Sequence, residues 1–307
     1  MKYRILGRTG MKVSVVGVGA WQFGGEWGKD YIQKEVDAII DKARQVGVNL
    51  IDTAECYGDH LSESLVGGAV RKDRERWIIA TKFGHKFHHF MDRTEHWTAA
   101  EVRQQLEDSL RALKTDYVDL YQFHSGNDAA FQQDDLWEML RKQVEAGKVR
   151  HVGISIRRSG AEPQIEAATK VGAETIQVVY NRLEPEAERE ILPSCQRQNL
   201  GVLARVPMAS GYLSGKYKPG ATFGANDFRS TQAREAVDRK LEAVARIQRE
   251  EVPAGVPMAQ WALAWCLRHQ AVTCVIPGCK SPEQVESNAK AVDLGDFVRG
   301  DHPQSAR

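Results

Sequence analysis

The sequence has no long hydrophobic run and no excess of charge of one sign. No apolar stretch approaches the roughly 20 residues that cross a bilayer, and the N-terminal MKYRILGRTG lacks the apolar region of a signal peptide. Lysine and arginine together number 42 and aspartate and glutamate 41, which gives a formal net charge of +1 over 307 residues. We therefore expect a cytoplasmic protein that binds neither nucleic acid nor a membrane surface.

Cysteine is scarce, and no two cysteines form a CxxC pair. There are five, at positions 56, 195, 266, 274 and 279. An odd number at scattered positions excludes a disulfide framework and is typical of free thiols in a reducing compartment. Cys56 adjoins Tyr57, and we interpret it as a small residue at the edge of a pocket rather than as a nucleophile.

Closely spaced imidazoles occur once, in the segment HKFHH at residues 85–89. No matched set of carboxylates and cysteines accompanies them, so we expect no metal site there. The segment is interpreted as a polar loop at the rim of a pocket.

The order of elements is regular, and no Pro/Gly/Ser-rich linker divides the chain. KYRILG and KVSVVG flank the turn RTG, which predicts a short N-terminal hairpin. Short apolar runs then alternate with amphipathic helical segments, the pattern of repeated βα units. Strands are expected at residues 16–19, 49–52, 77–82, 118–124, 149–155, 175–180, 202–206 and 272–276. Two helical segments, 232–250 and 257–269, precede the last strand, so we predict one α/β domain over residues 1–307, a (β/α)8 TIM barrel with an insertion after strand 7.

Four ionisable groups stand at, or just beyond, the ends of three successive predicted strands: Asp52, Tyr57, Lys82 and His124. Barrel enzymes place their chemistry at these C-terminal strand ends. A buried lysine needs a partner, and Asp52 on the adjacent strand can supply it. Asp52 and Lys82 could instead form a purely structural ion pair, with Tyr57 stacked on a loop. The addition of His124 at a third strand end favours a catalytic site.

The segments GVNLIDTAECYG, IIATK and YVDLYQFH resemble those that carry the catalytic Asp, Tyr, Lys and His of aldo-keto reductases. Further similarity runs in order through KVRHVGIS, IQVVYNRLEP, ASGYLSGKY and IPGCKSPEQVESN. The resemblance implies reversible NAD(P)H-dependent reduction of an aldehyde, ketone or sugar carbonyl. It also implies that Tyr57 donates a proton, Lys82 lowers the pKa of Tyr57, Asp52 holds Lys82 and His124 orients the carbonyl.

The cofactor should lie across the strand ends, because GVGAWQF has Gln22 where a dinucleotide fingerprint needs its third glycine. The resemblance implies that Ser155 and Gln177 bind the nicotinamide carboxamide. It implies that the pyrophosphate lies on a loop and the adenosine on the segment after the last strand. The loop residues are Leu213, Ser214, Gly215 and Lys216, and the adenosine residues are Gly278, Lys280, Gln284 and Asn288. Ser281 is expected to cap the helix that follows.

Two positions depart from the commonest family pattern. Ile156 stands where an asparagine is frequent, and Arg205 where an aromatic residue often stacks on the nicotinamide. A guanidinium can also stack on a ring, so we expect Arg205 to pack on or near the nicotinamide. Lys280 can neutralise a 2′-phosphate, which favours NADPH over NADH.

Trp21 and Trp27 follow the first barrel strand and are expected to line the substrate pocket. Two other functions compete with carbonyl reduction. One is a cofactor-binding regulatory subunit resembling potassium-channel β subunits, and the other a metal-dependent barrel hydrolase, which the lack of ligand spacing disfavours. The sequence leaves the substrate, the reaction direction and the oligomeric state open.

Overall fold

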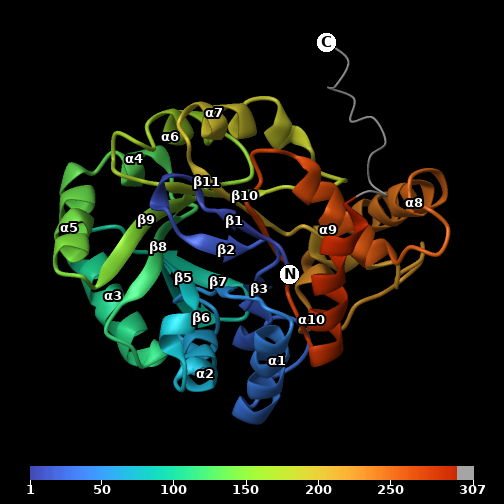
Figure 1. Ribbon diagram of the computed structural model, residues 1–307, viewed down its shortest axis with the longest axis horizontal. Coiled ribbons are helices and arrows are strands. Elements are labelled where there is room, and N and C mark those ends of the chain that lie inside the picture. The colour runs from blue at the N-terminus through green and yellow to red at the C-terminus, as the bar shows by residue number, and fades with distance from the viewer. Residues whose placement is uncertain (296–307) are drawn as a thin grey trace.

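Eight parallel strands form the centre of the structure, a computed structural model that describes residues 1–295 (Figure 1). They pair in chain order, and bridges from Val16 to Val275 and from Gly19 to Gly278 join the first strand to the last. The (β/α)8 barrel fold is confirmed. The strands are β3 (Val18–Gly19), β4 (Leu50–Asp52), β5 (Ile78–Phe83), β8 (Val118–His124), β9 (Val149–Ser155), β10 (Thr175–Val179), β11 (Gly201–Arg205) and β12 (Cys274–Ile276).

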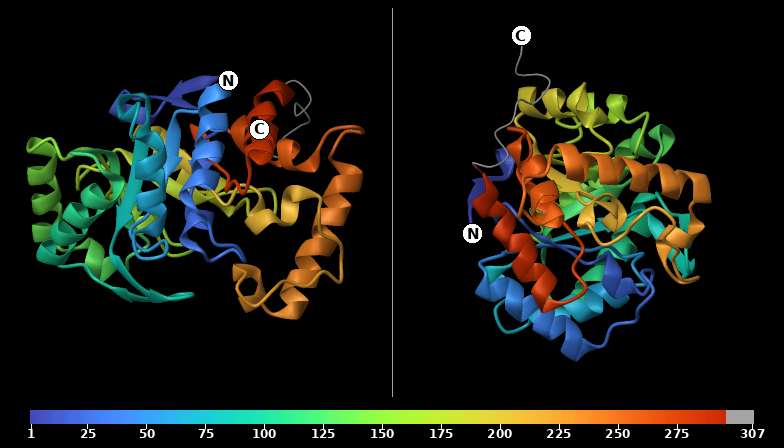
Figure 2. Two further views of the ribbon diagram at one scale, coloured as in Figure 1. Left: turned by 90° about the horizontal axis from the view of Figure 1, so that it is seen from below. Right: turned by 90° about the vertical axis from the view of Figure 1, so that its right-hand side faces the viewer.

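Helices surround the strands because each buries one apolar stripe. In α1 (Gln33–Gln45), four buried residues recur at three-and-four spacing: Val36, Ile39, Ile40 and Ala43. The insertion after β11 contains α8 (Arg234–Glu250), which lies at the periphery in Figure 2. The other helices are α2 (Leu61–Val70), α3 (Ala99–Leu113), α4 (Asp128–Phe131), α5 (Asp134–Glu145), α6 (Glu162–Glu166), α7 (Ile191–Arg197), α9 (Met258–Arg268) and α10 (Pro282–Ala289).

The expected N-terminal hairpin, β1 (Tyr3–Ile5) and β2 (Lys12–Ser14), closes the end of the barrel seen in Figure 1. Leu6 and Val13 pack there against an apolar layer inside the barrel. The Arg4 guanidinium donates hydrogen bonds to the carbonyls of Val272 and Leu267. The apolar layer against which Leu6 and Val13 pack is made of Leu50, Ala80, Leu120, Leu203, Cys274 and Ile276.

A polar layer lies directly above the apolar one. Side chains two residues apart on a strand share a face, so Asp52 follows Leu50 inside the barrel, and Lys82 follows Ala80. The same two-residue step leads from Leu120 to a glutamine, Gln122, and from Leu203 to Arg205. The strand sequences therefore place an apolar floor beneath a polar site.

One element was not expected. The segment interpreted as a rim loop forms an antiparallel hairpin of β6 (His85–His89) and β7 (Asp92–Glu95). In the left view of Figure 2 it lies at the end of the barrel opposite the N-terminal hairpin. Both strands are polar and mostly exposed, so apolar alternation could not reveal them.

No helix among residues 1–295 is long and apolar enough to cross a membrane. The prediction of a single domain over residues 1–307 includes residues 296–307, which lie outside the described part of the chain.

Candidate active site

Lys82 is the central contact of the site. Its Nζ lies 2.7 Å from Asp52 Oδ2, 2.6 Å from the Thr53 carbonyl oxygen and 3.3 Å from the Tyr57 hydroxyl. Lys82 and Asp52 are both buried. Burial acts to lower the pKa of Lys82, but the Asp52 carboxylate and the Tyr57 hydroxyl together outweigh it and the pKa is raised. Lys82 is therefore a buried cation that faces the phenol.

Amide groups hold the other oxygen of Asp52. Its Oδ1 accepts hydrogen bonds from Gln177 Nε2 at 2.7 Å and from Gln122 Nε2 at 3.2 Å. Ser155 Oγ in turn donates to Gln177 Oε1 at 3.3 Å. The predicted carboxamide-binding residues Ser155 and Gln177 thus join the same buried network as Asp52. Gln122 was missed from sequence, although it precedes His124 by two residues on the same face of β8.

Tyr57 lies within this network, but its acidity differs from the expectation. Burial raises the pKa of Tyr57 to about 12, although the Lys82 ammonium acts to lower it. The indole of Trp21 stacks on the phenol with ring centroids 5.9 Å apart. Desolvation therefore outweighs the lysine, and the phenol is protonated at neutral pH.

His124 completes the group. Its ring lies edge-on to that of Tyr57, with centroids 6.2 Å apart, and 5.0 Å from the ring of His85. Burial, with the nearby charges of His85 and Lys82, holds the pKa of His124 well below its usual range. The imidazole is therefore neutral at neutral pH. The structure brings all four residues predicted for catalysis together.

Aromatic side chains pack around Trp21, the ring that stacks on the Tyr57 phenol. Trp21 packs edge-on against the buried Trp27 at 5.1 Å, and Phe228 lies 5.2 Å from Trp21. Trp21 Nε1 donates a hydrogen bond of 2.7 Å to Glu26 Oε2. Glu26 is buried, and it also accepts bonds from the backbone of Met91 and from Arg93. Sequence reasoning missed Glu26, because a carboxylate in a loop gives no periodic signal.

The residues expected at the pyrophosphate and adenosine follow β11 and β12. Leu213, Ser214, Gly215 and Lys216 lie at the end of a short 3-10 segment, Ala209–Ser214, where Gly215 has a φ of 76° that favours glycine. Gly278 faces Gly19 across the seam of the barrel.

The turn into α10 is held by its own side chains. Ser281 Oγ caps the helix as expected by accepting the Gln284 N–H. Gln284 Oε1 accepts the Lys280 N–H at 2.8 Å, and Asn288 Nδ2 lies 3.4 Å from Cys279 Sγ. Gln284 and Asn288 therefore make internal bonds here.

Comparisons with known proteins decide the family. The sequence model of the Aldo/keto reductase family matches residues 15–304. The chain belongs to the aldo/keto reductase family. It is 33% identical to the uncharacterized oxidoreductase YrpG of Bacillus subtilis, over 96% of this chain and 92% of YrpG. It is 29% identical to a probable voltage-gated potassium channel subunit beta of Arabidopsis thaliana, over 96% of this chain and 92% of that one. The solved holo form of aldo-keto reductase AKR11C1 from Bacillus halodurans matches with a TM-score of 0.80 and 28% identity, over 100% of both chains.

Family membership makes this aldo/keto reductase an oxidoreductase of carbonyl compounds, and its residues fit a nicotinamide cofactor. Arg205 has a buried Nε without a hydrogen-bond partner, and desolvation lowers the pKa of its guanidinium to about 10. Burial lowers the pKa of Lys280, and the positive charges of Arg229, Lys216 and Lys29 lower it further, against the opposing charge of Asp227. An aromatic ring such as nicotinamide would suit the position beside Arg205, and phosphates would suit the position beside Lys280.

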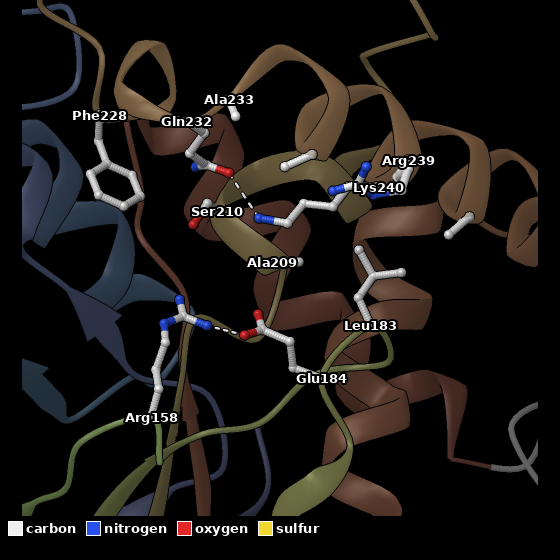
Figure 3. Close-up of a pocket in the computed structure, with 12 residues that line it drawn as sticks. Arg158, Leu183, Glu184, Ala209, Ser210, Phe228, Gln232, Ala233, Arg239 and Lys240 are labelled. Atoms are coloured by element: carbon white, nitrogen blue, oxygen red, sulfur yellow. Dashed lines mark hydrogen bonds and ion pairs between the residues drawn. The ribbon is translucent and has the colours of Figure 1, made fainter.

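A cavity of about 610 Å³ in this aldo/keto reductase lies between the segments that carry Arg158, Leu183, Ala209 and Phe228 and the start of α8 (Figure 3). Arg158 pairs with Glu184 on its wall, and Lys240 donates a bond of 2.8 Å to Gln232. None of the four residues predicted for catalysis is among its described lining residues. Phe228 lines the cavity and also packs against Trp21, whose ring stacks on Tyr57.

Proposed function

We propose that this aldo/keto reductase uses NADPH to reduce an aldehyde, ketone or sugar carbonyl, with Tyr57 as the proton donor. The observation that carries the proposal is the contact of Lys82 Nζ with both Asp52 and the Tyr57 hydroxyl. The bound nicotinamide would supply a hydride to the carbonyl carbon. The Tyr57 O–H would give its proton to the carbonyl oxygen.

The other side chains support this transfer. Proton donation leaves a phenolate on Tyr57, and the Lys82 ammonium at 3.3 Å stabilises that charge. Asp52 keeps the ammonium in place. The neutral His124 ring has an N–H that can donate to the carbonyl oxygen as negative charge develops on it.

We further propose where the cofactor binds. Arg205, Ser155 and Gln177 would hold the nicotinamide end, the 213–216 loop the pyrophosphate, and Lys280 the 2′-phosphate. The lysines and arginine around Lys280 support the placement of phosphates there. All five cysteines are free thiols, which supports a reducing compartment such as the cytoplasm.

Tyr57→Phe tests the assignment of the acid. We expect kcat for carbonyl reduction to fall by about 10²–10⁴-fold, with NADPH affinity near normal because the ring remains. Tyr3→Phe is the matched control, since Tyr3 is 42% exposed and its hydroxyl donates to the Gly47 carbonyl. Retention of turnover in Tyr57→Phe would show that another group is the acid.

A second candidate is a regulatory subunit that senses its cofactor, and the similarity to a potassium channel β subunit favours it. A screen of aldehydes, ketosteroids, quinones and sugars with NADPH separates the two functions. Tight NADPH binding without turnover of any carbonyl would support the regulatory function.

A further inference from the structure

Glu55, Cys56 and His124 bring three different donor atoms to one point. A carboxylate oxygen, the Cys56 Sγ and a ring nitrogen all lie within 4.8 Å of one another. Cys56 Sγ is 3.8 Å from His124 Nδ1. The first two residues are buried, and His124 is partly buried beside the proposed site of the carbonyl.

Glu55 has an oxygen that nothing in the described structure uses. Its Oε1 accepts the His85 backbone N–H at 2.9 Å, but Oε2 is buried without a hydrogen-bond partner. The side chain is only 3% exposed. A buried carboxylate oxygen without a partner is costly, so a ligand that coordinates Oε2 would remove this cost. The proposed reduction assigns no role to Glu55.

The donor set suits a transition-metal ion. Zinc is bound by thiolate, imidazole and carboxylate, often with a fourth position left to water. A tetrahedral ion would hold the sulfur and nitrogen about 3.5 Å apart, since Zn–S and Zn–N bonds are about 2.3 Å and 2.0–2.1 Å long. The observed 3.8 Å needs a movement of only a few tenths of an ångström.

We propose that Glu55, Cys56 and His124 form a binding site for a soft divalent metal ion, for which Zn²⁺ is the probe. On binding, the Cys56 thiol releases its proton to solvent and its sulfur coordinates the ion. The ion also takes Nδ1 of His124, the ring nitrogen 3.8 Å from Cys56 Sγ, so it fixes the ring in the metal site and places a divalent charge beside the proposed site of the carbonyl. Zinc should therefore inhibit this enzyme reversibly. The neighbouring cations Lys82 and Arg93 oppose a metal ion, and the thiolate and carboxylate charges offset them.

Metal binding is measured on the full chain without a polyhistidine tag, by calorimetry with Zn²⁺ and by absorption with Co²⁺. We expect one high-affinity ion per chain and a near-ultraviolet charge-transfer band from thiolate to cobalt. Cys56→Ala should lack the charge-transfer band and bind Zn²⁺ at least tenfold more weakly than the wild-type chain. Cys195→Ala is the matched control, because Cys195 is a buried thiol on α7. This variant should keep both the charge-transfer band and the Zn²⁺ affinity of the wild-type chain.

Other outcomes would overturn the site. Zinc that binds equally well to Cys56→Ala, or cobalt that binds without a thiolate band, would point to exposed imidazoles such as His88 and His89. If Cys56→Ala fails to fold, Glu55→Gln serves instead. Glu55→Gln keeps the shape of the side chain. It should weaken Zn²⁺ binding several-fold, while the thiolate-to-cobalt band persists. An unchanged Zn²⁺ affinity would count against the proposal.

Inhibition is tested separately with NADPH and an active carbonyl. Zn²⁺ should abolish turnover of the wild-type chain, and EDTA should restore it. Turnover by Cys56→Ala should resist inhibition by Zn²⁺. Only this part rests on the proposed function. An enzyme that binds one zinc at Cys56 but reduces no carbonyl would overturn the proposed reduction and leave the metal site standing.

Discussion

Asp52 Oδ2 lies 2.7 Å from Lys82 Nζ, and both side chains are removed from solvent. Two buried charges stabilise each other only while both are present. Asp52 also ties Lys82 to β8 and β10, because its other oxygen accepts the amides of Gln122 and Gln177. The carboxylate therefore serves both the barrel and the proposed reaction.

Asp52→Asn should damage stability and catalysis together. The substitution leaves the Lys82 charge buried without its counter-charge, which costs about 3–5 kcal/mol of the free energy of unfolding. Urea denaturation measures this loss, and kcat should fall as well. Asp41→Asn is the control, since Asp41 is 62% exposed and its removal should change stability by about 0.5 kcal/mol or less. A stable and active Asp52→Asn would contradict the proposed role of the pair.

Glu26→Gln should affect the carbonyl more than the cofactor. Glu26 accepts the Trp21 indole N–H and is contacted by Arg93, so it fixes the ring that stacks on Tyr57. Hydrogen bonds to a charged group are worth about 1.5–3 kcal/mol each, and the amide replaces one acceptor by a donor. We expect KM for the carbonyl to rise several-fold with NADPH affinity unchanged. Glu35→Gln, at an exposed ion pair with Lys29, is the control. A carbonyl KM of Glu26→Gln equal to that of the wild-type chain would disprove the positioning role of Glu26.

Arg205→Met should weaken NADPH binding without destabilising the protein. The guanidinium is desolvated and its Nε has no partner, so removing the charge relieves a burial cost that offsets the loss of the Nη2 hydrogen bond to the Ile156 carbonyl. A lost stacking contact of about 0.5–2 kcal/mol corresponds to a roughly two- to thirtyfold higher Kd. Calorimetry with NADPH and thermal denaturation give the two readouts. Unchanged affinity would place Arg205 away from the nicotinamide.

Lys280→Met should change the preference between cofactors. Loss of a charge-assisted bond of about 1.5–3 kcal/mol would lower kcat/KM for NADPH roughly ten- to a hundredfold, while kcat/KM for NADH should hardly change. Lys290→Met is the matched control on an exposed lysine of the same region. An equal loss with both cofactors would mean that Lys280 acts through its bond to the Trp27 carbonyl instead.

Much of the fold could be predicted because the strand sequences are distinctive. The bounds expected for β8 and β9 match those observed, and the others differ by one or two residues at one or both ends. The contact of Asp52 with Lys82 could also be predicted, since both stand at the C-terminal ends of adjacent parallel strands. Strand order alone was enough to bring these two side chains together.

Features that depend on burial could not be predicted. The pKa of Tyr57 was expected to fall because Lys82 is near, yet desolvation raises it to about 12. The side chains that cover the phenol come from distant loops, which the sequence does not place. The roles of Glu26 and Glu55 were missed for the same reason, because a single acidic residue gains a partner only when the loops fold.

The N-terminal hairpin has a consequence for the order in which the chain can fold. Arg4 donates its hydrogen bonds to carbonyls 263 and 268 residues further along. During synthesis the hairpin is made long before the segments that it contacts. Contacts of such long sequence separation slow folding. The barrel can therefore close only after residues 274–276 have been made, and until then its apolar layer has an open seam that chaperones could recognise.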